Sequence, residues 1–505
     1  MGMDSSPPQA APTLTPKLPI ADAFRPEYLE YYRFLPLELS DGILRVATSG
    51  EQNADALDDL RQSFDAELEL CEVPGDQLAD AIRRVFAAQE SVLELVRDLR
   101  AGEEAPADSG DESLSDTRSL ASQPPVIRFV NLLIREAHEA SASDIHLEAT
   151  RDGMRVRIRV DGVLSELPAP PRALQPAVVS RIKLLAELDI AERRAPQDGR
   201  VRVRLETREL DLRVSTVPTL HGESVVLRLL DRGGRAVTLD ELGMAPAMLD
   251  SFRRLASRPH GIVLATGPTG SGKTTTLYAA LGLRQSCAEK IITVEDPVEY
   301  HLERITQVPV HAKAGVTFAS ALRSILRQDP DVLMVGEMRD AETAGIACQA
   351  AMTGHLVFST LHTNDAISAL TRLADLGVEP YMVAATVEGV LAQRLVRRIC
   401  GDCSERYRPD PSAVALLSGK PVGAVMLQRG RGCASCRQTG YRGRTGIFEL
   451  LSMTDELKQS LLGPPVLTTL RRIAIDQGLT TLKADGWAKV QAGITTVEEV
   501  LRVVE

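Results

Sequence analysis

The stretch from Gly261 to Thr276 carries residues that could hold the phosphates of a nucleotide. A short apolar run typical of a buried strand opens it, and a phosphate-binding loop pattern follows, formed by Gly267, Pro268, Thr269, Gly270, Ser271, Gly272, Lys273 and Thr274. Glycines let backbone N–H groups curl around an anion, and the next helix directs its positive end there. Lys273 can reach the outer phosphates, and the Thr274 hydroxyl can hold Mg²⁺.

Two acidic segments also follow apolar runs and are expected at the same site. Glu295, Asp296 and Glu299 come directly after one run. Carboxylates this close repel one another unless a cation balances them, and nucleotide-bound Mg²⁺ is the natural partner. The alternative interpretation is an acidic loop in solvent. Glu337 follows another run across one glycine, and we predict that it orients the attacking water.

Two histidines flank the apolar run Leu356–Phe358. Either His355 or His362 could donate to a γ-phosphate oxygen and sense whether ATP or ADP is bound. A lone histidine is usually structural, whereas two around one strand favour a functional role. We prefer His362, because it lies beyond the carboxyl end of the predicted strand, where ligands bind in parallel sheets.

An arginine-rich segment precedes the phosphate-binding loop. Its apolar residues alternate with arginines in several runs, which predicts half-buried strands with a basic exposed face. Most of these arginines are expected to be solvated. An arginine delivered from a neighbouring subunit to a γ-phosphate is a known device of phosphoryl transfer, and the candidates are Arg200, Arg213 and Arg228.

Four of the seven cysteines form two CxxC pairs, Cys400 with Cys403 and Cys433 with Cys436. Four thiolates are the ligand set of tetrahedral structural Zn²⁺, and such a site has no open position for catalysis. Paired knuckles favour structural zinc over redox or empty cysteines in a reducing compartment. A DNA-reading zinc finger is the rival interpretation, which the net charge of −11 weakens.

The composition indicates a globular protein of several domains. A length of 505 residues exceeds one core and suggests about three domains. No signal pattern and no apolar run of spanning length is visible, so we expect a cytoplasmic protein with only peripheral membrane association. The acidic charge and an aromatic content of 4% argue against a nucleic-acid motor.

The first quarter of the chain is expected to form a docking module on a tether. Residues 1–19 are rich in Pro, Ser and Ala and are expected to be disordered. Residues 20–99 predict a small α/β docking domain with helices over 54–64 and 77–99. Residues 100–123 are acid-rich and predict a flexible linker.

The rest of the chain is expected to hold the chemistry. Residues 124–234 predict the arginine-rich α/β domain. Residues 235–505 alternate apolar runs with helical patterns, which predicts a mostly parallel sheet covered by helices. Within them we expect a zinc module at 397–447 and short helices over 449–505.

These motifs resemble those of bacterial secretion ATPases. The chain is most similar to the type II secretion assembly ATPases, the general secretory pathway protein E family, from about residue 20 to its end. The resemblance is carried by GPTGSGKT at 267–274, TVEDPVEY at 293–300, LMVGEMRD at 333–340, TGHLVFSTLHTND at 353–365, AERRAPQDGR at 191–200 and CRQTGYRGRTGIFEL at 436–450. A short N-terminal module on an acidic linker looks more like the secretion branch than like type IV pilus assembly ATPases.

The resemblance implies a RecA-like phosphate-loop core joined flexibly to a PAS-like α/β domain, with ATP and Mg²⁺ between them and a Zn²⁺ module. It implies a homo-hexameric motor that hydrolyses ATP at the inner membrane and extends a pseudopilus. Residues 20–99 would dock on the cytoplasmic domain of an inner-membrane component, the L component, and the motor would meet the membrane platform protein. The alternatives are type IV pilus assembly and a nucleic-acid translocase with a RecA-like core.

Overall fold

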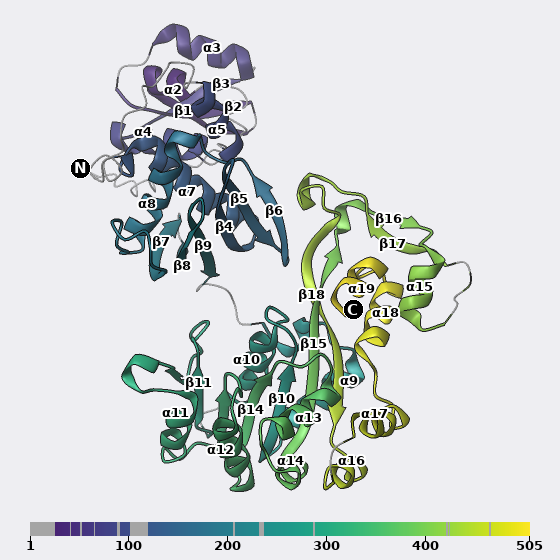
Figure 1. Cartoon of the computed structure of the whole chain (residues 1–505). Helices are drawn as coiled ribbons and strands as arrows, with labels where there is room; N and C mark the ends of the chain where they lie inside the picture. The colour runs from purple at the N-terminus through teal and green to yellow at the C-terminus, as the bar shows by residue number, and fades with distance from the viewer. Residues whose placement is uncertain are drawn as a thin grey trace, which may run out of the picture.

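The protein is described by a computed structural model (Figure 1). It covers residues 26–40, 42–50, 53–64, 66–87, 91–101, 120–205, 208–231, 237–285, 288–420, 423, 425–463 and 466–504. The predicted disordered tail and residues 102–119 of the predicted linker lie outside this described part. The architecture is mixed α/β, as predicted, with separate sheets along the chain.

A small α/β module begins the described chain. Its core is formed by apolar side chains such as Phe34, Leu44 and Leu60. The helix predicted over 54–64 is confirmed. The elements are α2 (Pro26–Tyr32), β1 (Phe34–Ser40), β2 (Ile43–Thr48), α3 (Ala54–Phe64), β3 (Glu67–Glu72) and α4 (Gly75–Ala87), and the strands pair in the order β1-β2-β3.

The helix predicted over 77–99 is two helices in the structure. Helix α4 ends at Ala87, and α5 (Val92–Ala101) starts a new element. Val92, Leu95 and Val96 of α5 share one helical face, and they are buried in the core of the next unit, against α7 (Pro124–Glu139). The structure therefore places α5 with the second unit, not in the module that was predicted to run to residue 99.

The second unit is a six-stranded antiparallel sheet with two helices, α7 and α8 (Gln175–Leu185), in its core. The predicted alternation is confirmed, because Val156, Ile158 and Leu212 are buried while the arginines between them lie on the other face. The strands pair in the order β6-β5-β4-β9-β8-β7 and are β4 (Ala142–Thr150), β5 (Gly153–Val160), β6 (Val163–Leu167), β7 (Gln197–Leu205), β8 (Arg208–Thr219) and β9 (Gly222–Asp231).

The ATPase-like core is a seven-stranded sheet, parallel except for its edge strand β18. Its order is β12-β11-β13-β14-β10-β15-β18, which confirms the predicted mostly parallel sheet. The strands are β10 (Gly261–Thr266), β11 (Ile291–Glu295), β12 (Thr306–Pro309), β13 (Val332–Val335), β14 (Leu356–Leu361), β15 (Val387–Ile399) and β18 (Tyr441–Ser452). Strands β10 and β14 are buried throughout, as expected for strands covered on both faces.

Helices cover this sheet and leave the carboxyl ends of its parallel strands at one edge. Two apolar clusters flank the sheet, one holding Phe252 and Leu277, the other Leu322 and Leu370. The helices are α9 (Pro246–Ala256), α10 (Lys273–Arg284), α11 (Phe318–Ile325), α12 (Ala341–Met352), α13 (Ala366–Asp375) and α14 (Pro380–Thr386).

The cysteine module is continuous with two strands of the large sheet, β15 and β18. Strands β15 and β18 form a long antiparallel pair, and β16 (Ser404–Tyr407), α15 (Pro411–Ser418) and β17 (Leu427–Gly430) lie between them in sequence. The predicted division at residue 447 therefore falls inside β18, whose Ile447 and Phe448 are both buried. Four helices follow, confirming the predicted helical end: α16 (Asp455–Ser460), α17 (Leu467–Asp476), α18 (Leu482–Gln491) and α19 (Val497–Val504).

Short 3₁₀ turns complete the chain at Arg172–Leu174, Leu239–Leu242, Ala312–Ala314, Gly401–Cys403 and Ala434–Cys436. In the part of the chain that the structure describes, no helix is long and apolar enough to cross a membrane.

Candidate functional site

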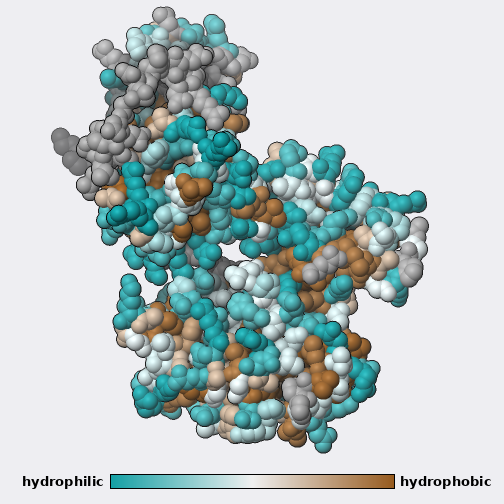
Figure 2. All heavy atoms as spheres, in the orientation of Figure 1, coloured by the Kyte–Doolittle hydropathy of each residue, from teal (hydrophilic) through white to brown (hydrophobic). Residues whose placement is uncertain are grey.

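A cleft of about 920 Å³ lies where the parallel strands of the large sheet end and the six-stranded sheet faces them. Mainly hydrophilic residues occupy this region in Figure 2. The structure brings together here most of the predicted site residues, including Thr269, Gly270, Ser271, Gly272, Lys273, Thr274, Glu295, Asp296, Glu299, Glu337, His362 and Arg228. Residues that follow β10, β11, β13 and β14 thus share one space, as the parallel topology predicts, and Arg228 reaches it from the six-stranded sheet.

The phosphate-binding loop joins β10 to α10 and is shaped by left-handed glycines. Gly272 has φ of 88°, and a Cβ there would lie 2.7 Å from the Gln393 amide nitrogen. A side chain is therefore excluded on two grounds. The Ser271 hydroxyl is buried and finds no hydrogen-bond partner among the described residues. An open cradle with an unsatisfied buried donor fits a nucleotide phosphate.

Lys273 begins α10 and folds back over the loop. Its Nζ donates to the carbonyl oxygens of Gly267 at 2.8 Å and Pro268 at 3.0 Å. Burial lowers the pKa of Lys273 to about 8; the Glu337 carboxylate acts against this shift and the Arg394 cation adds to it. An ammonium group that is costly to keep charged gains most when a phosphate arrives beside it.

Glu295 is a buried carboxylate in the lining of the cleft. Its side chain is only 2% exposed, and its two carboxylate oxygens accept hydrogen bonds from Tyr278, Thr293 and Gln307. Burial and the bond to Glu295 raise the pKa of Tyr278, which keeps this hydroxyl a donor. Because the Glu295 oxygens are already engaged, Glu295 fits the role of a structural anchor better than that of a metal ligand.

The fit of Mg²⁺ depends on the other oxygen donors. Asp296 is exposed, Glu299 is half-buried, and Thr274 lies in the first turn of α10; all three line the cleft. Carboxylate and hydroxyl oxygens are the hard ligands that Mg²⁺ prefers, and it binds through one or two carboxylates plus nucleotide phosphates. The residues present therefore fit Mg²⁺, with Thr274, Asp296 and Glu299 as the groups able to hold it.

Glu337 and His362 come from neighbouring strand ends, β13 and β14. The Glu337 side chain is 15% exposed; it pairs with Arg339, and its Oε2 lies 3.5 Å from His362 Nε2. A carboxylate and an imidazole thus line the same cleft as the phosphate-binding loop, where they could act on a water or a phosphate oxygen.

His355 is not brought to the cleft. It precedes β14, so it lies at the amino edge of the sheet, and its Nδ1 is 2.9 Å from the carbonyl oxygen of Ala350 at the end of α12. The expectation that either histidine could sense the γ-phosphate is corrected accordingly: only His362 is placed to do so, because the strand between them separates the two sheet edges.

The three candidate arginines reach different places. Arg228 lines the cleft, and its Nε is 3.0 Å from the Asp144 carboxylate. Arg213 donates to the Val298 carbonyl oxygen of the acidic loop at 2.9 Å. Arg200, the cross-strand neighbour of Arg213, lines a hollow of about 410 Å³ that Arg213 and Arg228 also line. Of the three arginines, Arg228 alone also lines the cleft. Arg213 and Arg228 thus approach the nucleotide site of their own chain, although an arginine from a neighbouring subunit was expected.

Several residues of the site carried no sequence signal. Asp144 holds Arg228; burial acts against ionisation, yet hydrogen bonds from Ser143 and Arg228 leave the pKa of Asp144 lowered. Arg394 of β15 donates to the Asn364 carbonyl oxygen at 3.0 Å. Asp144 and Arg394 lie on strands that are distant in sequence from the phosphate-binding loop, so only the tertiary fold reveals that they belong to the site. Arg339 was detectable, since it shares the strand end of Glu337.

The four paired cysteines converge at the far end of β15 and β18. All four Sγ atoms lie within 4.8 Å of one another, with 3.9 Å between Cys400 and Cys433 and 3.8 Å between Cys403 and Cys436. Zn–S bonds of about 2.3 Å in a tetrahedron place sulfur atoms about 3.8 Å apart. The backbone N–H of Gly440, 3.3 Å from Cys436 Sγ, supports a thiolate there. The donor set therefore fits a structural zinc ion, with no open ligand position.

Comparison with known proteins adds the family. A family model described as type II/IV secretion system protein matches residues 119–502, and a model of the MshEN domain matches residues 10–92. The chain is 46% identical over 491 residues to type II secretion system protein E of Xanthomonas campestris pv. campestris, covering 97% of this chain and 86% of that protein. It is 51% identical over 379 residues to the type II secretion system ATPase E of Vibrio cholerae, covering 75% of each.

The similar proteins also include two pilus motors and an ATPase that shares the fold. The type IV pilus assembly ATPase PilB of Myxococcus xanthus is 41% identical over 480 residues, which cover 94% of this chain and 85% of PilB. Among solved structures, the pilus retraction motor PilT with bound ADP is 27% identical, with a TM-score of 0.53 over 74% of this chain and 95% of PilT. The Legionella pneumophila ATPase DotB shares the fold at 20% identity and a TM-score of 0.56, with the same coverage. The chain therefore belongs to the type II/IV secretion system protein family, and its relatives include the type II secretion ATPases named protein E.

Proposed function

We propose that this chain is the ATP-hydrolysing subunit of a homo-hexameric motor that powers type II protein secretion by driving pseudopilus assembly. The single observation that supports it best is the cleft in which the phosphate-binding loop, Glu337 and Arg228 face one another. Phosphoryl transfer to water needs positioning and charge neutralisation more than covalent help from the protein, and this set of residues supplies both.

Each residue has a defined part in the reaction. Lys273 and the loop N–H groups hold the β- and γ-phosphates of ATP. Glu337 orients the attacking water and takes its proton as the water oxygen bonds to the γ-phosphorus and the bond to the ADP oxygen breaks. Arg228, held by Asp144, and Arg213 balance the charge on the transferred oxygens. Thr274, Asp296 and Glu299 would hold Mg²⁺, which would neutralise charge on the phosphate oxygens.

The site also suggests how hydrolysis becomes movement. The cleft is lined by two units of the chain, the six-stranded sheet and the ATPase core, so phosphate loss removes the anion that both units contact. His362 would report that loss, since it lies beside Glu337 in the same cleft. Release of Arg213 and Arg228 would then let the two units separate, a hinge movement of the kind that follows nucleotide hydrolysis elsewhere.

The motor would work at the cytoplasmic face of the inner membrane as a peripheral protein. The N-terminal module, residues 20–99, is the proposed docking site for the cytoplasmic domain of the membrane L component, and the membrane platform protein is a further expected partner. Nucleic acid is not an expected partner, because the chain carries a net charge of −11 and few aromatic residues. The four-cysteine module would hold Zn²⁺ as a structural ion.

Type IV pilus assembly is the second candidate, favoured by the similarity to PilB along 94% of the chain. The two can be separated by complementation. We expect the chain to restore export in a strain that lacks its type II secretion ATPase, and not pilus extension in a strain that lacks its pilus assembly ATPase. Restored pili without restored export would assign the chain to the pilus branch.

The enzymatic part is tested by ATPase assays on the purified full-length chain, with and without the cytoplasmic domain of the membrane partner. We expect the partner to stimulate turnover, Lys273→Ala to abolish it, and Glu337→Gln to lower it by about 10²-fold or more while nucleotide binding persists. Lys313→Ala, at an exposed turn, is the matched control. Stimulation by DNA alone would instead favour a translocase, and a wild-type hexamer that consumes no ATP would overturn the proposal.

A further inference from the structure

A tight turn of the six-stranded unit contacts the ATPase core beside the nucleotide cleft. Asp161 and Gly162 join β5 to β6 with φ of 50° and 85°, and Val160 pairs with Val163 across the turn. Asp-Gly is a sequence typical of two-residue hairpin turns that need positive φ at both positions. In Figure 1 this hairpin approaches the long β15–β18 pair of the core. The turn therefore stands at the boundary between the two units.

The Asp161 carboxylate makes two contacts across this boundary. Its Oδ2 accepts a hydrogen bond from the backbone N–H of Gly443 at 2.8 Å, and its Oδ1 lies 3.4 Å from Arg444 Nε. The Asp161 side chain is 18% exposed, so solvent and salt screen these contacts less than they screen a surface ion pair. Together with the bond from Arg213 to Val298, these contacts connect the six-stranded unit to the core at two places.

Strand β18 has a bulge at this contact. Between the pairings of Tyr441 and of Arg444, β18 has two residues where β15 has one. Gly443 is one of these two residues and has φ of 75°, the left-handed conformation of bulges that contain glycine. A bulge leaves its extra residue outside the regular ladder, so the Gly443 N–H is available to the Asp161 carboxylate.

The contact borders the nucleotide cleft from both units. Gly162 of the turn and Arg444 of β18 line the cleft. The Gly162 carbonyl oxygen accepts a hydrogen bond from Arg159 at 3.0 Å. Arg159 Nε in turn lies 3.8 Å from the Asp144 carboxylate, which also pairs with Arg228. The turn thus connects β18 to the arginine that is proposed to balance charge on the transferred phosphate.

The position of Arg444 depends on a partner of this kind. Its side chain is 42% exposed, and a long side chain in solvent has many rotamers unless a contact selects one. The cleft has walls from two units, so a nucleotide that binds there needs both walls in place. Contacts that hold the walls and the arginine in position before binding reduce the conformational cost of binding.

From this arrangement we propose that Asp161 is a positioning residue of the nucleotide site. It holds Arg444 in the cleft and keeps the six-stranded unit against β18, so that both walls are in place when the nucleotide binds. Asp161 itself does not line the cleft, and it acts through Arg444 and through the contact with Gly443. The inference rests on the proposed function only in taking this cleft as the nucleotide site.

Titration of the full-length chain with ADP and Mg²⁺ measures this role without hydrolysis. Asp161→Gly removes the carboxylate and keeps the left-handed turn, which glycine adopts readily. It should weaken ADP binding about tenfold, as expected for loss of a charge-assisted hydrogen bond. Asp161→Asn also suits the turn and keeps an oxygen that can accept from Gly443, but it has no charge for Arg444, so we expect about a threefold loss.

A double-mutant cycle tests whether the charge of Asp161 acts through Arg444. Arg444→Ala should weaken ADP binding, and adding Asp161→Asn to it should cause no further loss, because the charge then has no partner to hold. Hydrogen exchange gives an independent measurement of the other contact. The Gly443 amide should exchange at least tenfold faster in Asp161→Gly than in the wild type, and more slowly in Asp161→Asn than in Asp161→Gly.

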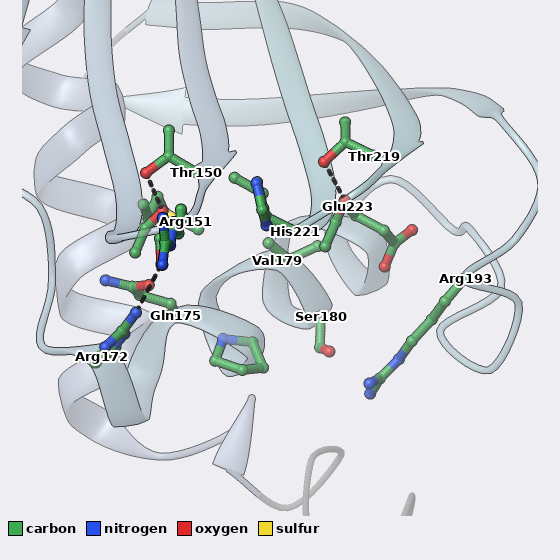
Figure 3. A pocket seen from close by; sticks show the side chains of 15 residues that line it. Thr150, Arg151, Arg172, Gln175, Val179, Ser180, Arg193, Thr219, His221 and Glu223 are labelled. Carbon is green, nitrogen blue, oxygen red and sulfur yellow. Dashed lines mark hydrogen bonds between the residues drawn. The ribbon is translucent and has the colours of Figure 1, made fainter.

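Asp152→Asn is the matched control. Asp152 is an exposed residue in the turn at the other end of β5, which joins that strand to β4. Figure 3 shows this turn, where Thr150 and Arg151 border a pocket that shares no lining residue with the nucleotide cleft. The ADP affinity of Asp152→Asn should equal that of the wild type.

The outcomes separate this inference from the motor function. ADP affinity that is unchanged or tighter in Asp161→Gly, or an Asp161→Asn loss that persists in full beside Arg444→Ala, would overturn the positioning role alone. If Asp161→Gly does not fold, Asp161→Asn and its cycle with Arg444→Ala still decide the question. A folded wild-type chain that binds no ADP would overturn both the positioning role and the proposed function.

Discussion

The Arg213 guanidinium donates a 2.9 Å hydrogen bond to the carbonyl oxygen of Val298, which joins the six-stranded sheet to the acidic loop of the same chain. Burial lowers the pKa of Arg213, while the Glu299 carboxylate nearby acts against this shift. Arg228 faces Arg213 across the β8–β9 pair and lines the cleft. These contacts favour arginines that serve the nucleotide of their own subunit.

Mixing of subunits tests this arrangement. Chains with Arg228→Ala and chains with Lys273→Ala are each expected to lose ATPase activity, and the proposed hexamer assembled from both should stay as inactive as either parent. The reason is that every site then lacks either its own lysine or its own arginine. Activity that returned on mixing would mean that Arg228 acts across the subunit interface. As a control, wild-type chains are mixed with Lys273→Ala chains to show that subunits exchange between assemblies.

The two histidines that flank β14 are expected to behave differently. His362→Ala should lower turnover about tenfold or more with little change in ATP affinity, since the side chain lies beside Glu337 and is proposed to act on the γ-phosphate. His355→Ala, at the opposite edge of the sheet, should leave kcat near the wild-type value and cost only the helix-end hydrogen bond. Equal losses of turnover and nucleotide binding in His362→Ala would remove its sensing role.

Lys273 should make nucleotide affinity depend on pH. Its pKa is lowered to about 8 by burial, and a bound phosphate favours the charged ammonium and raises that pKa. Below about pH 8, Lys273 is protonated in both the free and the ADP-bound protein, so ADP affinity does not change with pH. Above about pH 8, the free protein loses the Lys273 proton that the complex keeps, so ADP affinity falls by up to about tenfold per pH unit. ADP titrations at pH 7, 8 and 9 measure this slope.

Lys273→Arg provides the control for the pH effect, because arginine stays charged throughout this range. Its ADP affinity is expected to be weaker but flat between pH 7 and 9. A wild-type affinity that does not change over the same interval would contradict the assignment of the slope to Lys273.

The cysteine module should contain one zinc ion per chain. Metal analysis of Cys433→Ser is expected to show loss of that ion and a lower thermal midpoint, because a structural zinc site contributes directly to folding. ADP binding should persist, since none of the four cysteines lines the cleft. Cys71→Ser, in the N-terminal module, should keep its zinc. Zinc-free wild-type protein with an unchanged melting curve would refute the site.

Much of the site was predictable because parallel strands deliver their ends to one edge. The phosphate-binding loop, Glu337 and His362 each follow a strand directly, so a correct strand order was not needed to expect them together. His355 shows the limit of that reasoning, since it precedes its strand and lies at the other edge. Whether a residue follows or precedes its strand, and not merely that it lies next to one, decides which residues meet.

Contacts between distant segments were not predictable. The partnership of Asp144 with Arg228 depends on the pairing of β4 with β9, which the pattern of neither strand predicts by itself. Likewise, α5 has an ordinary amphipathic pattern that fits either core, and only packing against α7 decides between them. Local patterns determine which face of an element is buried, but not the partner that buries it.

Strand β15 links the two chemistries of the molecule. It pairs with β10, the strand that leads into the phosphate-binding loop, its Gln393 accepts a hydrogen bond from Thr276 of α10, and it ends at Ile399, next to Cys400. At about 3.3 Å per residue, such a strand spans roughly 40 Å. The strand that borders the phosphate-binding loop therefore continues directly into the four-cysteine module. A tilt of β15 beside that loop must then displace the cysteine cluster.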